Sequence, residues 1–117
     1  MKPIIVADTS PLIALAKLQQ LKLLSHAFSS VHVPLTVLNE ATRDLNRPDA
    51  RLIRDFGAQL QIHTNADNEF CQKLRQTLDE GEIQALNLAR ELQCAVLMDE
   101  HMGRQVAHSS TFLWWEC

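Results

Sequence analysis

The fold is decided by the stretch IIVADTSPLIAL, residues 4–15. Its first four residues, 4–7, form a short β-branched run that is typical of a strand buried on both faces. Asp8 ends this run, and Ser10 followed by Pro11 predicts a helix start with serine as N-cap. A buried strand that ends in a carboxylate requires an explanation, because burying a lone carboxylate is costly.

The same arrangement recurs near the other end, in CAVLMDEHMGRQVA, residues 94–107. Residues 95–98 form an apolar run, Asp99 follows it, and a helix-like segment comes next. In parallel sheets the carboxyl ends of the strands meet at one edge, and ligands bind there. We therefore expect Asp8 and Asp99 to lie at the same rim of a sheet.

Strands and helices alternate along the rest of the chain. We expect strands at 31–33 and 59–64, and helices at 11–28 with a break at 19–20, 35–44, 49–56, 67–77, 78–92 and from about 103. Asp49 and Asp67 are expected to cap two of these helices. The alternation indicates an α/β fold, a three-layer α/β/α sandwich with a mainly parallel sheet.

Composition limits the class of protein. The 117 residues predict a single domain, 1–117, and a hydrophobic content of 46% is that of a globular protein. No apolar run approaches the roughly 20 residues of a membrane helix, and no secretory leader is evident. Cys71, Cys94 and Cys117 are odd in number and lack metal-binding spacing, which favours reduced thiols in a cytoplasmic protein.

A net charge of −3 does not favour general nucleic-acid binding, but arginines are concentrated in TRDLNRPDARLIRDF, residues 42–56. Aspartates are interleaved with them, so two interpretations stay open: a solvated, salt-bridged surface, or a patch that contacts phosphates. The arginines are Arg43, Arg47, Arg51 and Arg54.

Two glutamates fit the rim that Asp8 and Asp99 predict. Glu82 precedes Leu86 by four residues and therefore lies on the apolar face of its helix, and Glu40 also borders an inward face. Converging carboxylates repel each other unless a cation neutralises them, and Mg²⁺ prefers such oxygen ligands. A bound ion of this kind would support phosphodiester hydrolysis.

Ordinary structural roles remain open for each acid. Asp8 could cap a helix, Asp99 could be a turn residue, and Glu82 could favour the positive end of a helix dipole. Thr9 and Ser10 could hydrogen-bond the site or cap the helix. Neighbouring acids are expected to be solvated, and the histidines, which show no ligand spacing, to be non-catalytic. These acids are Asp79, Glu80 and Glu100, and the histidines are His26, His32, His63, His101 and His108.

Four segments together resemble the PIN-domain ribonucleases, over about residues 3–107. They are IVADTSPLIALAKL, VPLTVLNEA, LDEGEIQALNLARELQ and VLMDEHMGRQVA. The similar branch opens with N/D-T-S-P-L-I and carries an L-D-x-G-E helix, and many of its members are toxins of VapBC-type toxin–antitoxin pairs.

The resemblance implies a Mg²⁺- or Mn²⁺-dependent ribonuclease, commonly a homodimer, acting on RNA. A cognate antitoxin would block its site, often with a basic side chain. By position, the implied catalytic residues are Asp8, Glu40, Glu82 and Asp99, with Asp8, Glu82 and Asp99 as metal ligands and Thr9, Ser10 and Glu100 as auxiliary residues. If the arginine-rich segment is a phosphate-contacting patch, it would contact the RNA.

The tail HSSTFLWWEC, residues 108–117, departs from that family. Members of the family continue with a V-x-G-T/V strand and closing helices. Tryptophan has the single codon TGG, so LWWE read two bases out of register contains Val-Gly, which suggests a frameshifted or truncated end. The alternative is a genuine edge strand or contact surface at 112–115. The last strand and closing helix, within an atypical tail from 107, are therefore the doubtful part of the fold.

Two other functions compete with the nuclease. One is a non-catalytic PIN-like remnant that keeps only dimer or antitoxin contacts. The other is a phosphoacceptor receiver-like domain, which would need an acidic pair at the first strand and a lysine at a late strand end. None of the lysines is placed there; they are Lys2, Lys17, Lys22 and Lys73.

Overall fold

The computed structural model describes residues 2–98 and the backbone of 115–116. Within these residues five strands form one sheet in the order β3-β2-β1-β4-β5, and every neighbouring pair is parallel. The strands are β1 (Ile4–Ala7), β2 (Ser30–Pro34), β3 (Leu60–His63), β4 (Ala95–Met98) and β5 (Trp115–Glu116). The α/β class expected from the sequence is confirmed.

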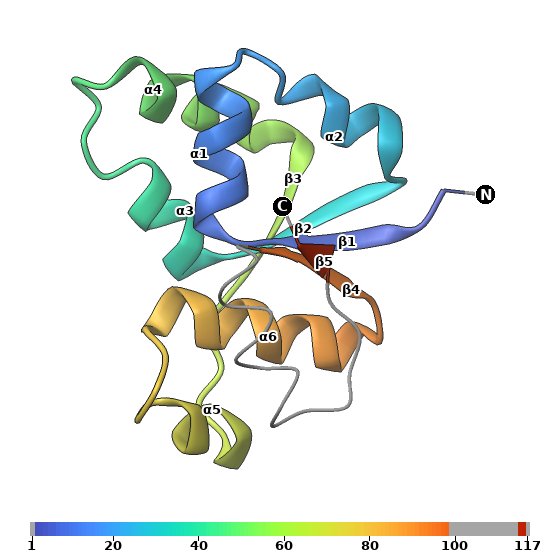
Figure 1. Cartoon of the computed structure of the whole chain (residues 1–117), viewed down its shortest axis with the longest axis vertical. Coiled ribbons are helices and arrows are strands. Elements are labelled where there is room, and N and C mark those ends of the chain that lie inside the picture. The colour runs from blue at the N-terminus through green and yellow to red at the C-terminus, as the bar shows by residue number, and fades with distance from the viewer. Residues whose placement is uncertain (1, 99–114, 117) are drawn as a thin grey trace.

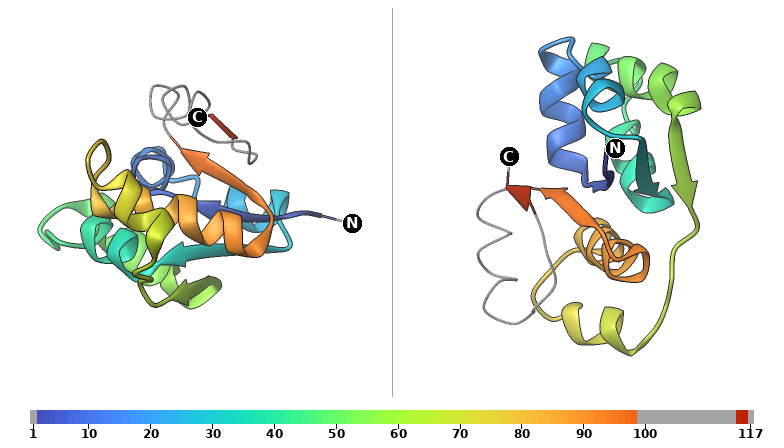
Figure 2. Two further views of the ribbon diagram at one scale, coloured as in Figure 1. Left: turned by 90° about the horizontal axis from the view of Figure 1, so that it is seen from below. Right: turned by 90° about the vertical axis from the view of Figure 1, so that its right-hand side faces the viewer.

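Helices cover both faces of this sheet (Figure 1). They are α1 (Thr9–Lys17), α2 (Lys22–Ala27), α3 (Leu35–Ala41), α4 (Pro48–Phe56) with the short 3-10 turn η1 (Gly57–Gln59), α5 (Glu69–Leu74) and α6 (Glu80–Leu92). The first four lie on one face, and α5 and α6 lie on the other, as the views in Figure 2 also show. The three-layer sandwich is therefore present.

The two faces of β1 explain why its sequence is apolar throughout. Ile5 and Ala7 belong to the core beneath α1–α4, whereas Val6 belongs to a second core with α6 and β4. Successive strand residues point to opposite faces, so a strand covered on both sides has no solvent-facing position. This strand is fixed in place by burial on both sides, and so is the residue that follows it.

The start of α1 differs from the expectation. The helix begins at Thr9, and Asp8 occupies the N-cap position with extended backbone angles (φ −87°, ψ 174°). Ser10 therefore lies inside the helix and is not its N-cap. Pro11 becomes the third helical residue. Its missing N–H costs nothing there, because the N–H groups of the first turn have no carbonyl acceptor within the helix.

Two other expected caps were also wrong by one or two residues. α4 begins at Pro48 with Arg47 as N-cap, so Asp49 lies in the first turn. α5 is capped by Asn68 instead of Asp67, because the Asn68 side chain accepts a hydrogen bond from the Cys71 N–H at 2.9 Å.

The order of the strands creates a switch point between β1 and β4. From β1 the chain moves outward to β2 and β3, and it then returns to pair β4 against the other side of β1. Ligands of open α/β sheets bind beyond the carboxyl ends of the strands at such a point. Receiver-like domains have the order 2-1-3-4-5, so the strand order excludes that alternative.

Beyond β4 the structure describes only a short edge strand. Trp115 pairs with Leu97 and Glu116 with Met98, so a genuine edge strand forms, slightly further along than expected. The helix expected from about 103, and the remaining tail to 114, lie outside the described residues. No helix in the described part of the chain is long and apolar enough to cross a membrane.

Candidate functional site

Asp8 lies at the switch point, directly after β1. Its backbone N–H donates to the carbonyl of Leu97 on β4 at 3.0 Å, which ties the residue to the neighbouring strand. Only 5% of its surface is exposed. The sheet therefore holds a nearly buried carboxylate at its carboxyl edge, as the sequence predicted.

Glu82 is held in the first turn of α6 by a reciprocal cap. The Asp79 carboxylate accepts from the Glu82 N–H at 2.9 Å, and the Glu82 carboxylate accepts from the Asp79 N–H at 3.2 Å. Asp79, which was expected to be a solvated neighbour and not a ligand, is exposed and is also the N-cap of this helix. The acid-x-x-Glu spacing is the signal that could have revealed it.

The carboxylate of Glu82 is in an unfavourable electrostatic environment. Loss of hydration raises its pKa to about 7, and the negative charges of Asp79 and Asp8 act in the same direction. Asp8 is therefore close enough to Glu82 to influence its ionisation. Two of the expected acids therefore lie near each other although they are 74 positions apart in the sequence.

Glu40 reaches the same place from α3. Its Oε2 accepts a hydrogen bond from the Thr9 hydroxyl at 3.3 Å, and its carboxylate packs against Gly81 at the start of α6. Thr9 follows Asp8, and Gly81 precedes Glu82, so the three acids gather at one rim. Ser10, in contrast, is exposed on α1.

No cation neutralises Glu40 or Glu82 within the described residues. The arginine nearest to this end of α6 in the sequence, Arg75, instead pairs with Glu80 at 3.2 Å and with Asp67 at 3.0 Å. Residues 2–98 contain no group of three or more acid, histidine or cysteine side chains arranged to hold a metal ion. The expected third ligand, Asp99, and its neighbour Glu100 lie outside the described residues.

A family model described as a PIN domain matches residues 4–112. The chain belongs to the PIN-domain family. No curated protein matches it at a significant level of sequence similarity. The PIN domain is a nuclease-type fold, so the acidic rim lies in a fold that supports hydrolysis of nucleic acids.

The arginines of this PIN domain lie on α4 and on the segment that joins it to α3. Arg47 pairs with Asp49 at 3.3 Å, and Arg54 pairs with Asp55 at 3.2 Å. Arg51 donates to the Leu45 carbonyl at 2.7 Å. Arg43, Arg47, Arg51 and Arg54 are all exposed. The segment is thus partly salt-bridged, while Arg43 and Arg51 form no ion pair within the described residues.

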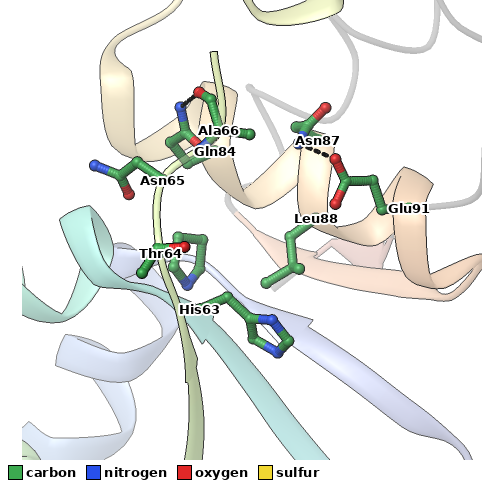
Figure 3. Close-up of a pocket in the computed structure, with 9 residues that line it drawn as sticks. His63, Thr64, Asn65, Ala66, Gln84, Asn87, Leu88 and Glu91 are labelled. Carbon is green, nitrogen blue, oxygen red and sulfur yellow. Dashed lines mark hydrogen bonds between the residues drawn. The ribbon is translucent and has the colours of Figure 1, made fainter. Parts of the chain in front are cut away.

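A cavity of about 240 Å³, which the sequence did not predict, separates α6 from the end of β3 (Figure 3). His63, Leu88 and Glu91 are among its lining residues, but Asp8, Glu40 and Glu82 are not. Along α6, Glu91 lies nine positions after Glu82, which places the two on opposite sides of the helix at 3.6 residues per turn. The cavity is therefore separate from the acidic rim of the PIN domain.

Proposed function

We propose that this PIN domain is a metal-dependent endoribonuclease whose active site comprises Asp8, Glu40, Glu82 and Asp99. The observation that carries the proposal is the environment of Glu82, which loses hydration beside Asp8 and Asp79 with no cation paired to it among the described residues. A protein maintains such unfavourable charge chiefly at functional sites, where a ligand relieves it.

The donor set suits a hard divalent cation. Asp8, Glu82 and Asp99 would hold Mg²⁺ or Mn²⁺, because these ions prefer carboxylate oxygens and keep water in their remaining positions. When bound, the ion would lower the pKa of a water molecule and stabilise the charge that develops on the phosphate. Glu40, oriented by Thr9, would accept a hydrogen bond from the attacking water and orient it.

The biological setting that we propose is the toxin half of a toxin–antitoxin pair in the cytoplasm. The support is the sequence resemblance together with a rim of acids that would accept a basic side chain from an antitoxin. A homodimer is part of the same proposal, and sedimentation of the purified chain tests it directly. A non-catalytic remnant is the alternative that the cleavage experiment must separate from the enzyme.

The experiment is cleavage of single-stranded and structured RNA with Mg²⁺ or Mn²⁺, and with chelator. We expect Asp99→Asn and Asp8→Asn to fold and to lose metal-dependent cleavage by roughly a hundredfold or more, because each removes a ligand charge. Glu91→Gln, which removes an acid from the far side of α6, is the matched control and should cleave normally.

A thermal-unfolding titration with Mn²⁺ accompanies this assay. An assembled site stabilises the native protein as the ion concentration exceeds the dissociation constant. Full cleavage by Asp99→Asn would overturn the assignment of the site. Absence of both cleavage and metal stabilisation in the wild-type chain would favour the remnant.

A further inference from the structure

Glu40 and Gly81 approach each other so closely that a side chain at position 81 would require the Glu40 carboxylate to move. A Cβ atom placed on Gly81 would lie 2.9 Å from Oε1 and 3.0 Å from Oε2 of Glu40, and 3.2 Å from its carboxyl carbon. Real Cβ atoms essentially never come within 3.0 Å of another heavy atom. The Glu40 carboxylate therefore occupies the volume that an alanine methyl group would fill.

The backbone of Gly81 gives no other reason for glycine. It is the second residue of α6, and no glycine among the described residues has a positive φ. In a helix, glycine is about 1 kcal/mol less favourable than alanine. Helix stability alone would therefore favour alanine here, and the space that Glu40 needs is what favours glycine.

Thr9, at the start of α1, also contacts the Glu40 carboxylate. Its hydroxyl donates to Oε2 of Glu40 at 3.3 Å from the first residue of α1. Glu40 is thus confined between the residue that follows Asp8 and the residue that precedes Glu82. Both contacts come from segments that also carry an acid of the rim.

We propose that Gly81 and Thr9 are positioning residues for Glu40, which they hold between the segments that carry Asp8 and Glu82. The expected effect on catalysis rests on the proposed nuclease function, but the position of the Glu40 side chain can be measured independently of that function. Displacing Glu40 would leave the fold intact, because its carboxylate is the end of a flexible side chain.

The principal test is Gly81→Ala with Gly57→Ala as the matched control, since a Cβ on Gly57 would meet nothing within 4 Å. We expect Gly81→Ala to keep or slightly raise the unfolding temperature and to lower kcat roughly tenfold or more with KM little changed. A crystal structure of the metal-free variant should show Glu40 rotated away and its contact with Thr9 lost.

Thr9→Val and Thr9→Ser form the second arm. Valine has the same shape without the donor and should lower kcat, whereas serine keeps the hydroxyl and should retain most of the activity. Wild-type kcat in Gly81→Ala, or an unmoved Glu40 carboxylate in its structure, would overturn the proposal. If the wild-type chain cleaves no RNA, the nuclease proposal fails, and the crystal structure of Gly81→Ala still decides where Glu40 is held.

Discussion

His32 and His63 are joined by a hydrogen bond across two neighbouring strands, with 2.8 Å between Nδ1 of His32 and Nε2 of His63. The other ring nitrogen of His32 lies 2.9 Å from the Ser30 hydroxyl oxygen. A hydrogen bond between two imidazoles requires one neutral ring as acceptor, so protonation of both rings breaks it. Glu91 of α6 lines the same cavity as His63.

The pair makes stability depend on pH. Loss of hydration lowers the pKa of His32 below its usual 6.5, and His63 adds to the effect. The unfolded chain therefore binds more protons, and the free energy of unfolding should fall as the pH drops below about 6.5. Between pH 7.5 and 5, the unfolding temperature of His32→Gln should depend less steeply on pH than that of the wild-type protein. His26→Gln, at an exposed site on α2, should keep the wild-type slope; equal slopes in all three proteins would contradict the prediction.

Glu82 should have the opposite effect to the histidine pair, because its contribution to stability decreases as the pH rises. Its pKa rises from 4.5 to about 7 on folding, so the metal-free native state binds the extra proton and loses stability as the pH increases through that interval. Glu82→Gln, which can still cap the Asp79 N–H, should be more stable than wild type at pH 8 by on the order of 1 kcal/mol. The difference should vanish at pH 4. Denaturant unfolding at both pH values in chelator measures it, and no gain at pH 8 would refute the expectation.

Gln84 anchors the segment after β3 to α6, as Figure 3 shows for its bond to Ala66. Gln84 is 3% exposed. Its side-chain oxygen accepts a hydrogen bond from the Ala66 N–H at 2.8 Å. Its amide group donates to the Ala66 carbonyl at 2.7 Å and to the Glu80 carboxylate at 2.9 Å. Gln84→Met should cost about 2–4 kcal/mol, because two backbone groups lose their partners. Denaturant unfolding and amide exchange at 64–68 measure this loss. Gln76→Met, at an exposed position, should change neither.

The sequence predicted the framework well because its signals are local. The four-residue apolar run of β1 and the helical spacing of Leu86 and Ala89 each indicate one element and one buried face. The helix caps were less accurate, since Asp67 and Asn68 are both good N-caps and only the backbone geometry selects between them. The acids at the rim followed from their positions beside these elements.

The close packing of Glu40 against Gly81 could not be predicted in the same way. It depends on where α3 crosses the start of α6, which is set by the packing of both helices on the sheet. Similarly, the cavity beside His63 arises from the path of the segment after β3. Neither feature has a periodic or compositional signal in the chain.

The arginine segment yields a prediction about RNA affinity that separates its two interpretations. Arg43 lies three residues after Glu40, just beyond the end of α3, and neither it nor Arg51 forms an ion pair among the described residues. Arg43→Gln and Arg51→Gln should each weaken RNA binding. Each should also reduce the slope of log K against log salt concentration by about 1, because each phosphate contact releases counterions. Arg47 and Arg54 should matter less, since neighbouring aspartates already neutralise them.

Fluorescence anisotropy with the Asp99→Asn protein, which we expect not to cleave RNA, measures this effect at several salt concentrations. Lys22→Gln is the charge-matched control, because Lys22 is exposed on α2 and, like Arg43 and Arg51, forms no ion pair among the described residues. If Lys22→Gln weakens binding as much as Arg51→Gln, the attraction is a general charge effect. The arginines would then form a solvated surface, and the RNA path would have to be sought elsewhere around the acidic rim.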